Sequence, residues 1–367
     1  MKQPLRIIDA DVHNNYGDSK ALLPYMSSFF QEQVKSTGLP TAALTVRSPI
    51  GVNRQDARPD TGGPAGSDPA FLKKHHLDEY GIDYAILTGS GILSISLWPD
   101  LDFSNAVASA YNDWLVETWL QFSPQFKGSI LINHGDPAAA AKEIDRMGPH
   151  PDMVQVLMAS GAHMPFGHRF YHPIYETAVR HGLPVAIHPG TEGAGIAGPP
   201  TPAGYPARYF EWHNILPANY MSHVNSLVCE GVFEKFPELT VVCIEGGIAW
   251  LPHLMWRMDK NYKALRFSTP WLKKLPSEYI KAHIRLTTQP IEEPDDPRHL
   301  TQIFEMIEGE KILMFSTDYP HWDFDSPKMA LPPMAQEMKQ RIMAGNAAEL
   351  YGLHAAPGVP TSNHGTL

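Results

Sequence analysis

The sequence contains only two cysteines, Cys229 and Cys243, among its 367 residues. Two thiols are too few for the disulfide scaffold of a chain of this size, and too few for a metal site built on thiolates. We therefore expect both cysteines to be core residues.

Basic residues are also scarce, with 29 Lys and Arg against 39 Asp and Glu and a formal net charge of −10. No Lys/Arg-rich run of the kind that follows a phosphate backbone is present in the sequence, so we expect no nucleic acid partner. No segment reaches the roughly 18 uninterrupted apolar residues of a membrane span, and the N-terminus lacks a signal-peptide pattern. The sequence predicts a soluble, cytoplasmic protein without a membrane partner.

Short β-branched runs alternate with longer segments of helical character, which predicts parallel strands joined by crossover helices. The eight candidate strands are Leu5–Asp11, Asp83–Thr88, Gly128–Asn133, Met153–Met158, Pro184–His188, Thr240–Glu245, Ile284–Thr288 and Ile312–Asp318. Eight is the number that a (β/α)8 barrel requires. Between two of them, Asp136 can cap a helix, Pro137 can occupy its first turn and Gly148 can end it.

Two stretches, 36–69 and 190–214, are too long to be ordinary connectors in a compact domain. Both are rich in glycine and proline, which prevents them from continuing as helices. We interpret them as lids, and we expect Gly190–Asn214 to close the mouth of the site and to contact the substrate. The sequence therefore predicts one barrel domain, 1–354, with these two inserted loops, followed by a flexible tail, 355–367.

Ionisable side chains follow four of the predicted strands. Asp11 and His13 end the first strand, and the fifth, sixth and eighth strands end in His188, Glu245 and Asp318. Active sites of such barrels collect at the carboxyl ends of the strands, and residues two apart on a strand point the same way. Imidazole with carboxylate is the ligand set of a zinc, manganese or iron site, so we expect Asp11 and His13 to share a metal.

Each of these residues also has a structural interpretation when taken alone. His188 or Asp318 could serve as a cap or a loop hydrogen-bonding group. Glu245, which precedes Gly246 and Gly247, could cap the helix that starts near Trp250. The occurrence of four such residues at predicted strand ends favours the metal site.

Further candidates surround the expected mouth of the barrel. His321, three residues after Asp318, is placed to act as a proton donor or a substrate clamp, although an exposed loop histidine would look the same in the sequence. Residues expected near the entrance and able to bind substrate are His163, Arg169, His172 and Arg208. Either arginine could hold a substrate carboxylate. No glycine-rich phosphate fingerprint stands at the strand ends, so a nucleotide cofactor is not expected.

Five motifs in order resemble a known family over nearly the whole chain. They are "DADVH", "IHPG", "SLVCEGVFEKFPELTVVCIEGGIAWLPHLMWRMD", "FSTDYPHWD" and "GNAAELYGL". The sequence resembles the amidohydrolase-related group of the amidohydrolase superfamily, which includes aminocarboxymuconate-semialdehyde and resorcylate-type decarboxylases. The resemblance implies a distorted (β/α)8 barrel, a homodimer, and a divalent metal on Asp11, His13, His188 and Asp318.

The sequence departs from that family at two positions. Members often begin with His-x-His or Glu-x-His, whereas this chain has Asp11 before His13, which leaves zinc, manganese or iron possible. In the decarboxylases the sixth strand typically ends in a histidine, and here Glu245 takes its place. We expect Glu245 to bind the metal or to lie within hydrogen-bond reach of its water. With His223 it could hold a second ion, although His223 could equally be a hydrogen-bonding group near a helix N-terminus.

Three functions follow from this site, in order of preference. The first is a metal-dependent hydrolase of a small amide, ester or related carbonyl, in which Asp318 accepts the proton of the attacking water. The second is a non-oxidative decarboxylase of an aromatic or unsaturated acid, against which Glu245 counts. The third is a dinuclear iron enzyme that activates oxygen. Asp318, Glu245 and His321 are the candidate catalytic residues in this scheme.

Overall fold

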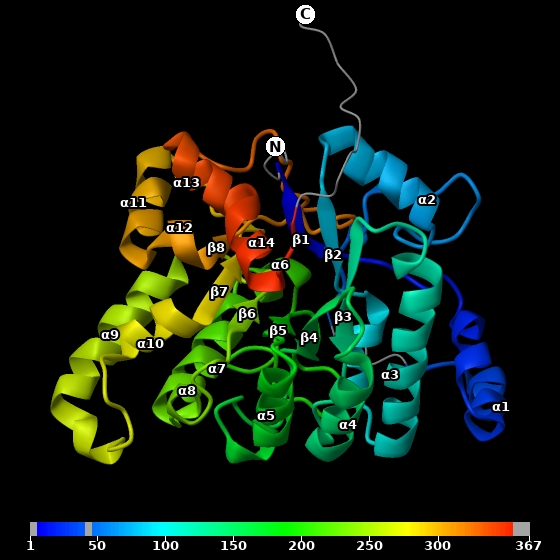
Figure 1. Ribbon diagram of the computed structural model, residues 1–367, viewed down its shortest axis with the longest axis horizontal. Helices are drawn as coiled ribbons and strands as arrows, with labels where there is room; N and C mark the ends of the chain where they lie inside the picture. Colours follow the sequence, from blue (N-terminus) through cyan, green and yellow to red (C-terminus); the bar gives the residue numbers. More distant parts are fainter. Residues whose placement is uncertain (1–5, 41–45, 355–367) are drawn as a thin grey trace, which may run out of the picture.

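The computed structural model describes residues 6–40 and 46–354, and it confirms the predicted barrel. Eight strands pair in parallel and in chain order, each with the next (Figure 1). The strands are β1 (Ile8–Val12), β2 (Tyr84–Leu87), β3 (Phe126–Leu131), β4 (Met153–Ala159), β5 (Val185–His188), β6 (Val241–Cys243), β7 (Ile284–Thr287) and β8 (Leu313–Met314). Each overlaps one of the eight predicted runs, although Leu5 lies outside the described residues.

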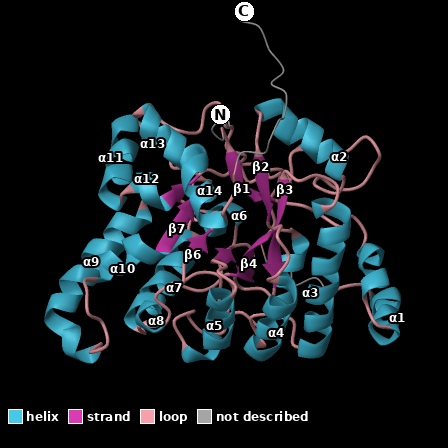
Figure 2. Cartoon of the chain, in the orientation of Figure 1, coloured by secondary structure: helices cyan, strands magenta, loops and turns pink. Residues whose placement is uncertain are grey.

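Helices surround these strands (Figure 2). The α-helices are α1 (Ser28–Thr37), α2 (Pro69–Leu72), α3 (Leu101–Leu115), α4 (Pro137–Met147), α5 (His172–Arg180), α6 (Tyr209–His213), α7 (Pro217–Cys229), α8 (Val232–Lys235), α9 (Trp250–Leu265), α10 (Pro276–His283), α11 (Pro297–Ile307), α12 (Gly309–Ile312), α13 (Gln336–Gln340) and α14 (Asn346–Tyr351). Short 3-10 or π segments are η1 (Ser19–Tyr25), η2 (Gln55–Ala57), η3 (Lys73–Asp78), η4 (Gly91–Leu97), η5 (Val116–Leu120), η6 (Arg169–Tyr171), η7 (Arg266–Ser268) and η8 (Arg341–Gly345).

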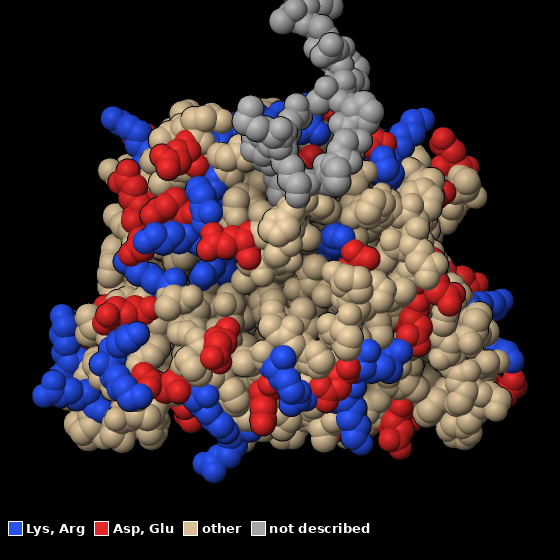
Figure 3. Space-filling model, in the orientation of Figure 1, with Lys and Arg blue, Asp and Glu red and all other residues tan. Residues whose placement is uncertain are grey.

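The helix signals of the sequence act as expected in α4. The Asp136 side chain accepts a hydrogen bond from the backbone of Ala139, Pro137 begins the helix, and Gly148 follows its last residue. Among the described helices, none combines the length and the apolar character that crossing a membrane requires. On the face drawn in Figure 3, acidic and basic side chains are interspersed.

The strands are buried on both faces, as parallel strands covered by helices are. Every residue of β4 is buried, and the same holds for β1, β3, β5 and β6. Cys243 is buried in β6, as expected. Cys229 at the end of α7 is only partly buried and packs against the edge of the core, so the expectation was too strong for this residue.

The barrel closes through the segment that follows β8. The backbone N–H of Ala10 donates to the Phe315 carbonyl over 2.9 Å, and that of His13 donates to the Tyr319 carbonyl over 2.7 Å. The N–H of Asp318 in turn donates to the carbonyl of Asp11 over 3.2 Å. Closure therefore sets Asp11 and Asp318, from opposite ends of the chain, next to each other.

Both long inserted segments lie over the mouth, the carboxyl end of the strands. In the first, 36–69, of which 41–45 lie outside the described residues, the carbonyl of Val52 accepts a hydrogen bond from Trp322, 2.9 Å away. In the second, 190–214, His213 of α6 has its Nε2 3.3 Å from Oδ2 of Asp323. These contacts lie at the mouth, where the lid interpretation requires them. The predicted tail, 355–367, falls outside the described residues.

Tyr220, on α7, links two strands just below the mouth. Its buried hydroxyl donates to the carbonyl of Ile187 over 3.1 Å and lies against the carbonyl of Ile244. These two residues directly precede His188 and Glu245. The hydroxyl therefore holds the ends of β5 and β6 together.

Replacing Tyr220 with Phe should lower the free energy of unfolding by about 1–3 kcal/mol, because it removes the hydroxyl that donates to the buried carbonyl of Ile244, whereas the Ile187 carbonyl keeps the backbone N–H of Ile244 as a donor. Urea denaturation measures this change. Tyr262→Phe is the control, since its hydroxyl donates to the Leu272 carbonyl from a partly exposed position and water can replace it there. Equal losses in the two variants would contradict the special role of Tyr220.

Candidate active site

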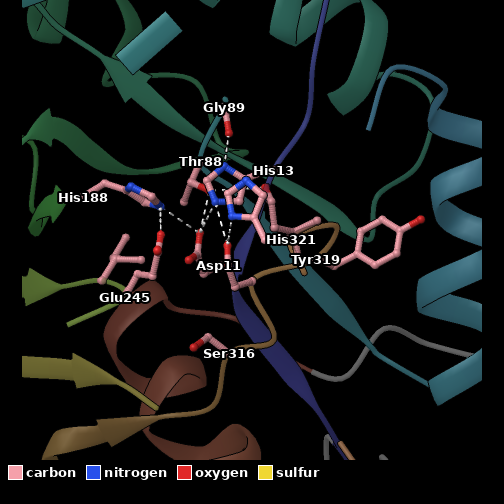
Figure 4. Close-up of polar contacts among 12 residues, drawn as sticks. Asp11, His13, Thr88, Gly89, His188, Glu245, Ser316, Tyr319 and His321 are labelled. Carbon is pink, nitrogen blue, oxygen red and sulfur yellow. Dashed lines mark hydrogen bonds and ion pairs between the residues drawn. The ribbon is translucent and has the colours of Figure 1, made fainter. Parts of the chain in front are cut away.

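Four predicted site residues converge at the mouth of the barrel. Asp11, His13, His188 and Glu245 each offer a ligand atom, and these atoms all lie within 4.8 Å of one another (Figure 4). Nε2 of His188 lies 3.6 Å from Oδ1 of Asp11 and 3.4 Å from Oε2 of Glu245. The arrangement brings together side chains from β1, β5 and the end of β6.

A second group of ligand atoms overlaps the first. It consists of His13, Glu245, Asp318 and His321, again within 4.8 Å of one another. Nε2 of His13 lies 2.9 Å from Oδ1 of Asp318, and Nδ1 of His321 lies 2.7 Å from the same oxygen. His321 therefore joins the site as a partly exposed neighbour of the buried Asp318.

Four buried atoms in this cluster have no hydrogen-bond partner within the described part of the chain: Oδ2 of Asp11, Nε2 of His13, Nε2 of His188 and Oδ1 of Asp318. Buried polar atoms are normally satisfied, so a group of four at one place calls for a ligand. Nδ1 of His13 faces the carbonyl of Gly89, and Nδ1 of His188 faces that of Pro189, 3.0 Å away.

Those two carbonyls determine the protonation of the imidazoles. A carbonyl can only accept, so Nδ1 carries a hydrogen, and Nε2 is the nitrogen that offers a lone pair when the imidazole is neutral. Nε2 of His13 faces Asp11 and Asp318, and Nε2 of His188 faces Asp11 and Glu245, so imidazole nitrogens and carboxylate oxygens form the donor set of a divalent transition metal. The residues present therefore fit the metal that the sequence predicts.

Neighbouring side chains orient the aspartates. The hydroxyl of Thr88 donates to Oδ1 of Asp11 over 2.6 Å, and the amide of Gln289 donates to Oδ2 of Asp318 over 3.2 Å. Such contacts hold a ligating carboxylate in place. The sequence analysis missed both residues, although Thr88 ends one predicted strand and Gln289 directly follows another.

Asp9 joins the two aspartate-bearing segments from below. Its buried carboxylate accepts hydrogen bonds from the backbone N–H of Thr317 over 2.9 Å and from the Thr317 hydroxyl over 2.6 Å. Nε2 of His76 lies 2.8 Å from Oδ2 of this carboxylate, the oxygen that also accepts from the Thr317 hydroxyl. Asp9 is the first residue of the "DADVH" motif, and its role is to position the backbone beside Asp11 and Asp318.

Two site carboxylates stand on left-handed backbone. Glu245 has φ of 56° and Asp318 has φ of 59°, in a region that side chains other than glycine rarely adopt. Glycine is required directly after Glu245, because a Cβ at Gly246 would lie 2.6 Å from the Tyr220 ring. Backbone strain of this kind occurs at functional sites, where the surrounding structure maintains it.

Glu245 is not the cap of the following helix. The backbone N–H groups of Ile248 and Ala249, at the start of α9, both donate to Oε1 of Glu292, over 2.9 and 2.8 Å. Glu292 therefore takes the capping role that the sequence left open for Glu245. The carboxylate of Glu245 faces His188 instead (Figure 4).

The buried charges of the site shift one another's protonation. Burial raises the pKa of Glu245 well above its usual value, and the neighbouring Asp318 raises it further. Burial alone would lower the pKa of His13, but Asp11 and Asp318 outweigh it and the pKa rises to about 9. Burial opposes ionisation of Asp318 too, yet His321 and His13 hold its pKa well below its usual value.

His223 does not join the cluster, which corrects the expectation of a second metal on Glu245 and His223. Its Nε2 donates to the carbonyl of Ser160 over 2.9 Å, and its Nδ1 accepts from the backbone of Phe166 over 3.2 Å. The ring also stacks on that of Phe166, with centroids 4.0 Å apart. No lone pair remains for a metal, so the structural interpretation of His223 holds.

The four residues proposed to bind substrate lie apart from the cluster. His163 borders a cavity of about 160 Å³ that the buried Glu192 also lines. His172 has its Nδ1 2.8 Å from Nζ of Lys235, so it faces α8. Arg169 and Arg208 are exposed, at the start of η6 and just before α6.

Metal binding should release a proton near neutral pH. Because His13 has a pKa of about 9, its imidazole is protonated at pH 7 in the metal-free protein and must lose that proton to bind an ion. Affinity for Mn²⁺ should therefore rise with pH, by up to about tenfold per unit, and level off above pH 9.

Calorimetry at pH 7 in two buffers of different ionisation enthalpy counts the protons released. His223→Gln is the control, because burial lowers the pKa of His223 to about 4 and it has no proton to lose at pH 7. Binding without proton release in the unmodified protein would disprove the protonated state of His13.

The comparisons with known proteins agree with this fold. The amidohydrolase family model matches residues 8–353. Among curated proteins, the chain is similar to gamma-resorcylate decarboxylase from Polaromonas sp., at 25% identity over 303 residues, covering 76% of this chain and 86% of that protein. It is also similar to the same enzyme from Rhodococcus jostii, at 24% over 298 residues, with coverages of 76% and 85%.

Solved structures share the barrel. A 5-carboxyvanillate decarboxylase from Novosphingobium aromaticivorans, complexed with manganese and 4-hydroxy-3-methoxy-5-nitrobenzoic acid, superposes with a TM-score of 0.70 at 20% identity, covering 95% of this chain and 96% of that one. A dihydroxybenzoic acid decarboxylase from Polaromonas sp., with manganese and 2-nitroresorcinol bound, gives 0.65 at 20%, covering 95% and 97%. Since the family model spans nearly all of the described barrel, the chain belongs to the amidohydrolase family.

Proposed function

We propose that the protein is a metal-dependent, non-oxidative decarboxylase of an aromatic acid with a hydroxyl group next to its carboxylate. The observation that carries the proposal is the group of four unsatisfied buried ligand atoms on Asp11, His13, His188 and Asp318. Sequence reasoning favoured hydrolysis, but the curated relatives are decarboxylases and support the alternative. Manganese is the proposed ion, because the related structures contain it.

The residues of this chain suit the chemistry of decarboxylation. A bound divalent ion would supply electrophilic pull on the carboxylate and the neighbouring oxygen of the substrate. His321, whose Nδ1 lies 2.7 Å from Oδ1 of Asp318, is placed to deliver a proton to the ring carbon. As that C–H bond forms, the bond to the carboxyl group breaks and carbon dioxide leaves, so that a proton replaces CO2 on the ring.

The second lid segment, 190–214, offers aromatic surface to such a substrate. Tyr209 stacks on His213 with ring centroids 5.5 Å apart, and Trp322 packs against His213 at 5.6 Å. Aromatic walls suit a planar ring and exclude water from the reacting carbon. Arg208, which directly precedes α6, remains the proposed partner of a second anionic group on the substrate.

The manganese-loaded protein should release CO2 from 2,6-dihydroxybenzoate or 5-carboxyvanillate and should lose this activity with a chelator. Chromatography detects the ring product of decarboxylation. A parallel assay with a panel of small esters and amides as substrates tests for hydrolysis. His321→Gln should lower kcat about a hundredfold, within the range for a lost general acid. His299→Gln, on the exposed surface of α11, should leave it unchanged. Turnover of the esters or amides alone would restore the hydrolase hypothesis.

Glu245→Gln keeps the size of the side chain and removes its charge, so it should lower metal content or turnover tenfold or more. Element analysis and steady-state kinetics measure the two effects separately. Glu292→Gln, which weakens the cap of α9, should reduce stability and leave metal content intact. Full metal content and activity in Glu245→Gln would show that this carboxylate has no part in the site.

A further inference from the structure

A third group of possible metal ligands lies beside the first two. His213, Glu245 and Asp323 each offer an atom, and the three atoms lie within 4.8 Å of one another. His213 is on the lid helix α6, and Asp323 follows β8 in the segment that also carries Asp318. The side chains of His213 and Asp323 are only 13% and 12% exposed.

This third group repeats the pattern of the first. Nε2 of His213 lies 3.3 Å from Oδ2 of Asp323, yet that buried oxygen has no hydrogen-bond partner in the part of the chain that the structure describes. The Asp318 oxygen that faces His13 is unsatisfied in the same way. In both places a carboxylate oxygen and an imidazole nitrogen approach each other without the geometry of a hydrogen bond, as two ligands of one ion do.

Glu245 belongs to all three groups of ligand atoms. It therefore lies near His188 and Asp11 of the first group and also near His213 and Asp323 of the third. A carboxylate has two oxygens, and in two-metal sites these can bind one ion each. A histidine at the same position would offer a single lone pair.

The charge of the site favours two cations over one. Four carboxylates gather here, and within the described chain none of them forms an ion pair with a lysine or an arginine; they are Asp11, Glu245, Asp318 and Asp323. One divalent ion offsets two of the four negative charges, and two ions offset all four. Uncompensated buried carboxylates are costly, and a second cation would offset the pair of charges that the first leaves over.

We propose that the protein binds a second divalent transition-metal ion through His213, Glu245 and Asp323, with Glu245 bridging it to the ion of the first cluster. The mixture of imidazole and carboxylate suits manganese, iron or zinc better than magnesium or calcium. The task of the second ion would be to attract an anionic substrate, and only this task rests on the proposed function. It also fastens the lid helix α6 to the mouth.

Gln289 connects the two halves of the proposed pair. Its amide nitrogen donates to Oδ2 of Asp318 and to the backbone carbonyl of Asp323, each over 3.2 Å. One side chain thus orients a ligand of the first ion and the backbone that carries a ligand of the second. The two ions would therefore be held in a fixed relation to each other.

The test is the metal stoichiometry of the full-length protein. Metal-free protein titrated with Mn²⁺ should bind about two ions per chain, measured by calorimetry and by element analysis after desalting. Asp323→Asn and His213→Gln should each bind about one ion, because the first cluster stays intact. Electron paramagnetic resonance should show a coupled manganese pair in the unmodified protein and a single-ion spectrum in both variants.

Asp325→Asn is the matched control, since this neighbouring carboxylate accepts the backbone N–H of Ile291 over 2.9 Å and lies outside all three groups. It should retain two ions. If the unmodified protein binds one ion at saturation, or if Asp323→Asn and His213→Gln both keep two, the second site does not exist and the two residues form an ion pair only.

The metal stoichiometry tests the second site and the decarboxylation assay tests the proposed function, so either proposal can be overturned without the other. One ion per chain together with CO2 release would overturn the second site and leave the proposed function standing. Two ions per chain without CO2 release from any hydroxybenzoate would support the second site and overturn the proposed function.

Discussion

The closure of the barrel between β1 and the segment after β8 is the constraint on which the site depends. The N–H of Asp318 donates to the carbonyl of Asp11, and the N–H of His13 donates to the carbonyl of Tyr319. Backbone hydrogen bonds thus fix the spacing of the two aspartates before any ion is bound. Asp9 strengthens the same junction from below by accepting two hydrogen bonds from Thr317. The ligand geometry is consequently a property of the fold itself.

The concentration of negative charge at this junction determines what the site can bind. Carboxylates held in a buried mouth either take up protons or attract cations, and the raised pKa of Glu245 shows that burial and like charge act on it together. Cations relieve that repulsion and turn the mouth from one that repels anions into one that attracts them. Under the proposed function, an aromatic carboxylate would therefore bind only to the metal-loaded protein.

Much of this arrangement could be predicted from the sequence, because strand periodicity and strand ends are local features. All eight strands were found, and Asp11, His13, His188, Glu245 and Asp318 meet in overlapping clusters. His223 was misplaced because nearness in the chain to β6 says nothing about the direction of a helix side chain. His213 was missed for a related reason: its position depends on how the loop 190–214 folds over the mouth, and that loop has no periodicity to follow.

The neighbouring residues give a physical reason for Glu245, rather than a histidine, at the end of the sixth strand. In the decarboxylases that the sequence resembles, a histidine typically stands there, and it would add no negative charge and no second ligand oxygen. With such a histidine, His213 and Asp323 would lack the oxygen that joins them to the first cluster. Glu245, His213 and Asp323 are therefore expected to occur together, as the ligands of the proposed second ion. A relative with histidine in place of Glu245 has no electrostatic reason to keep both of the others.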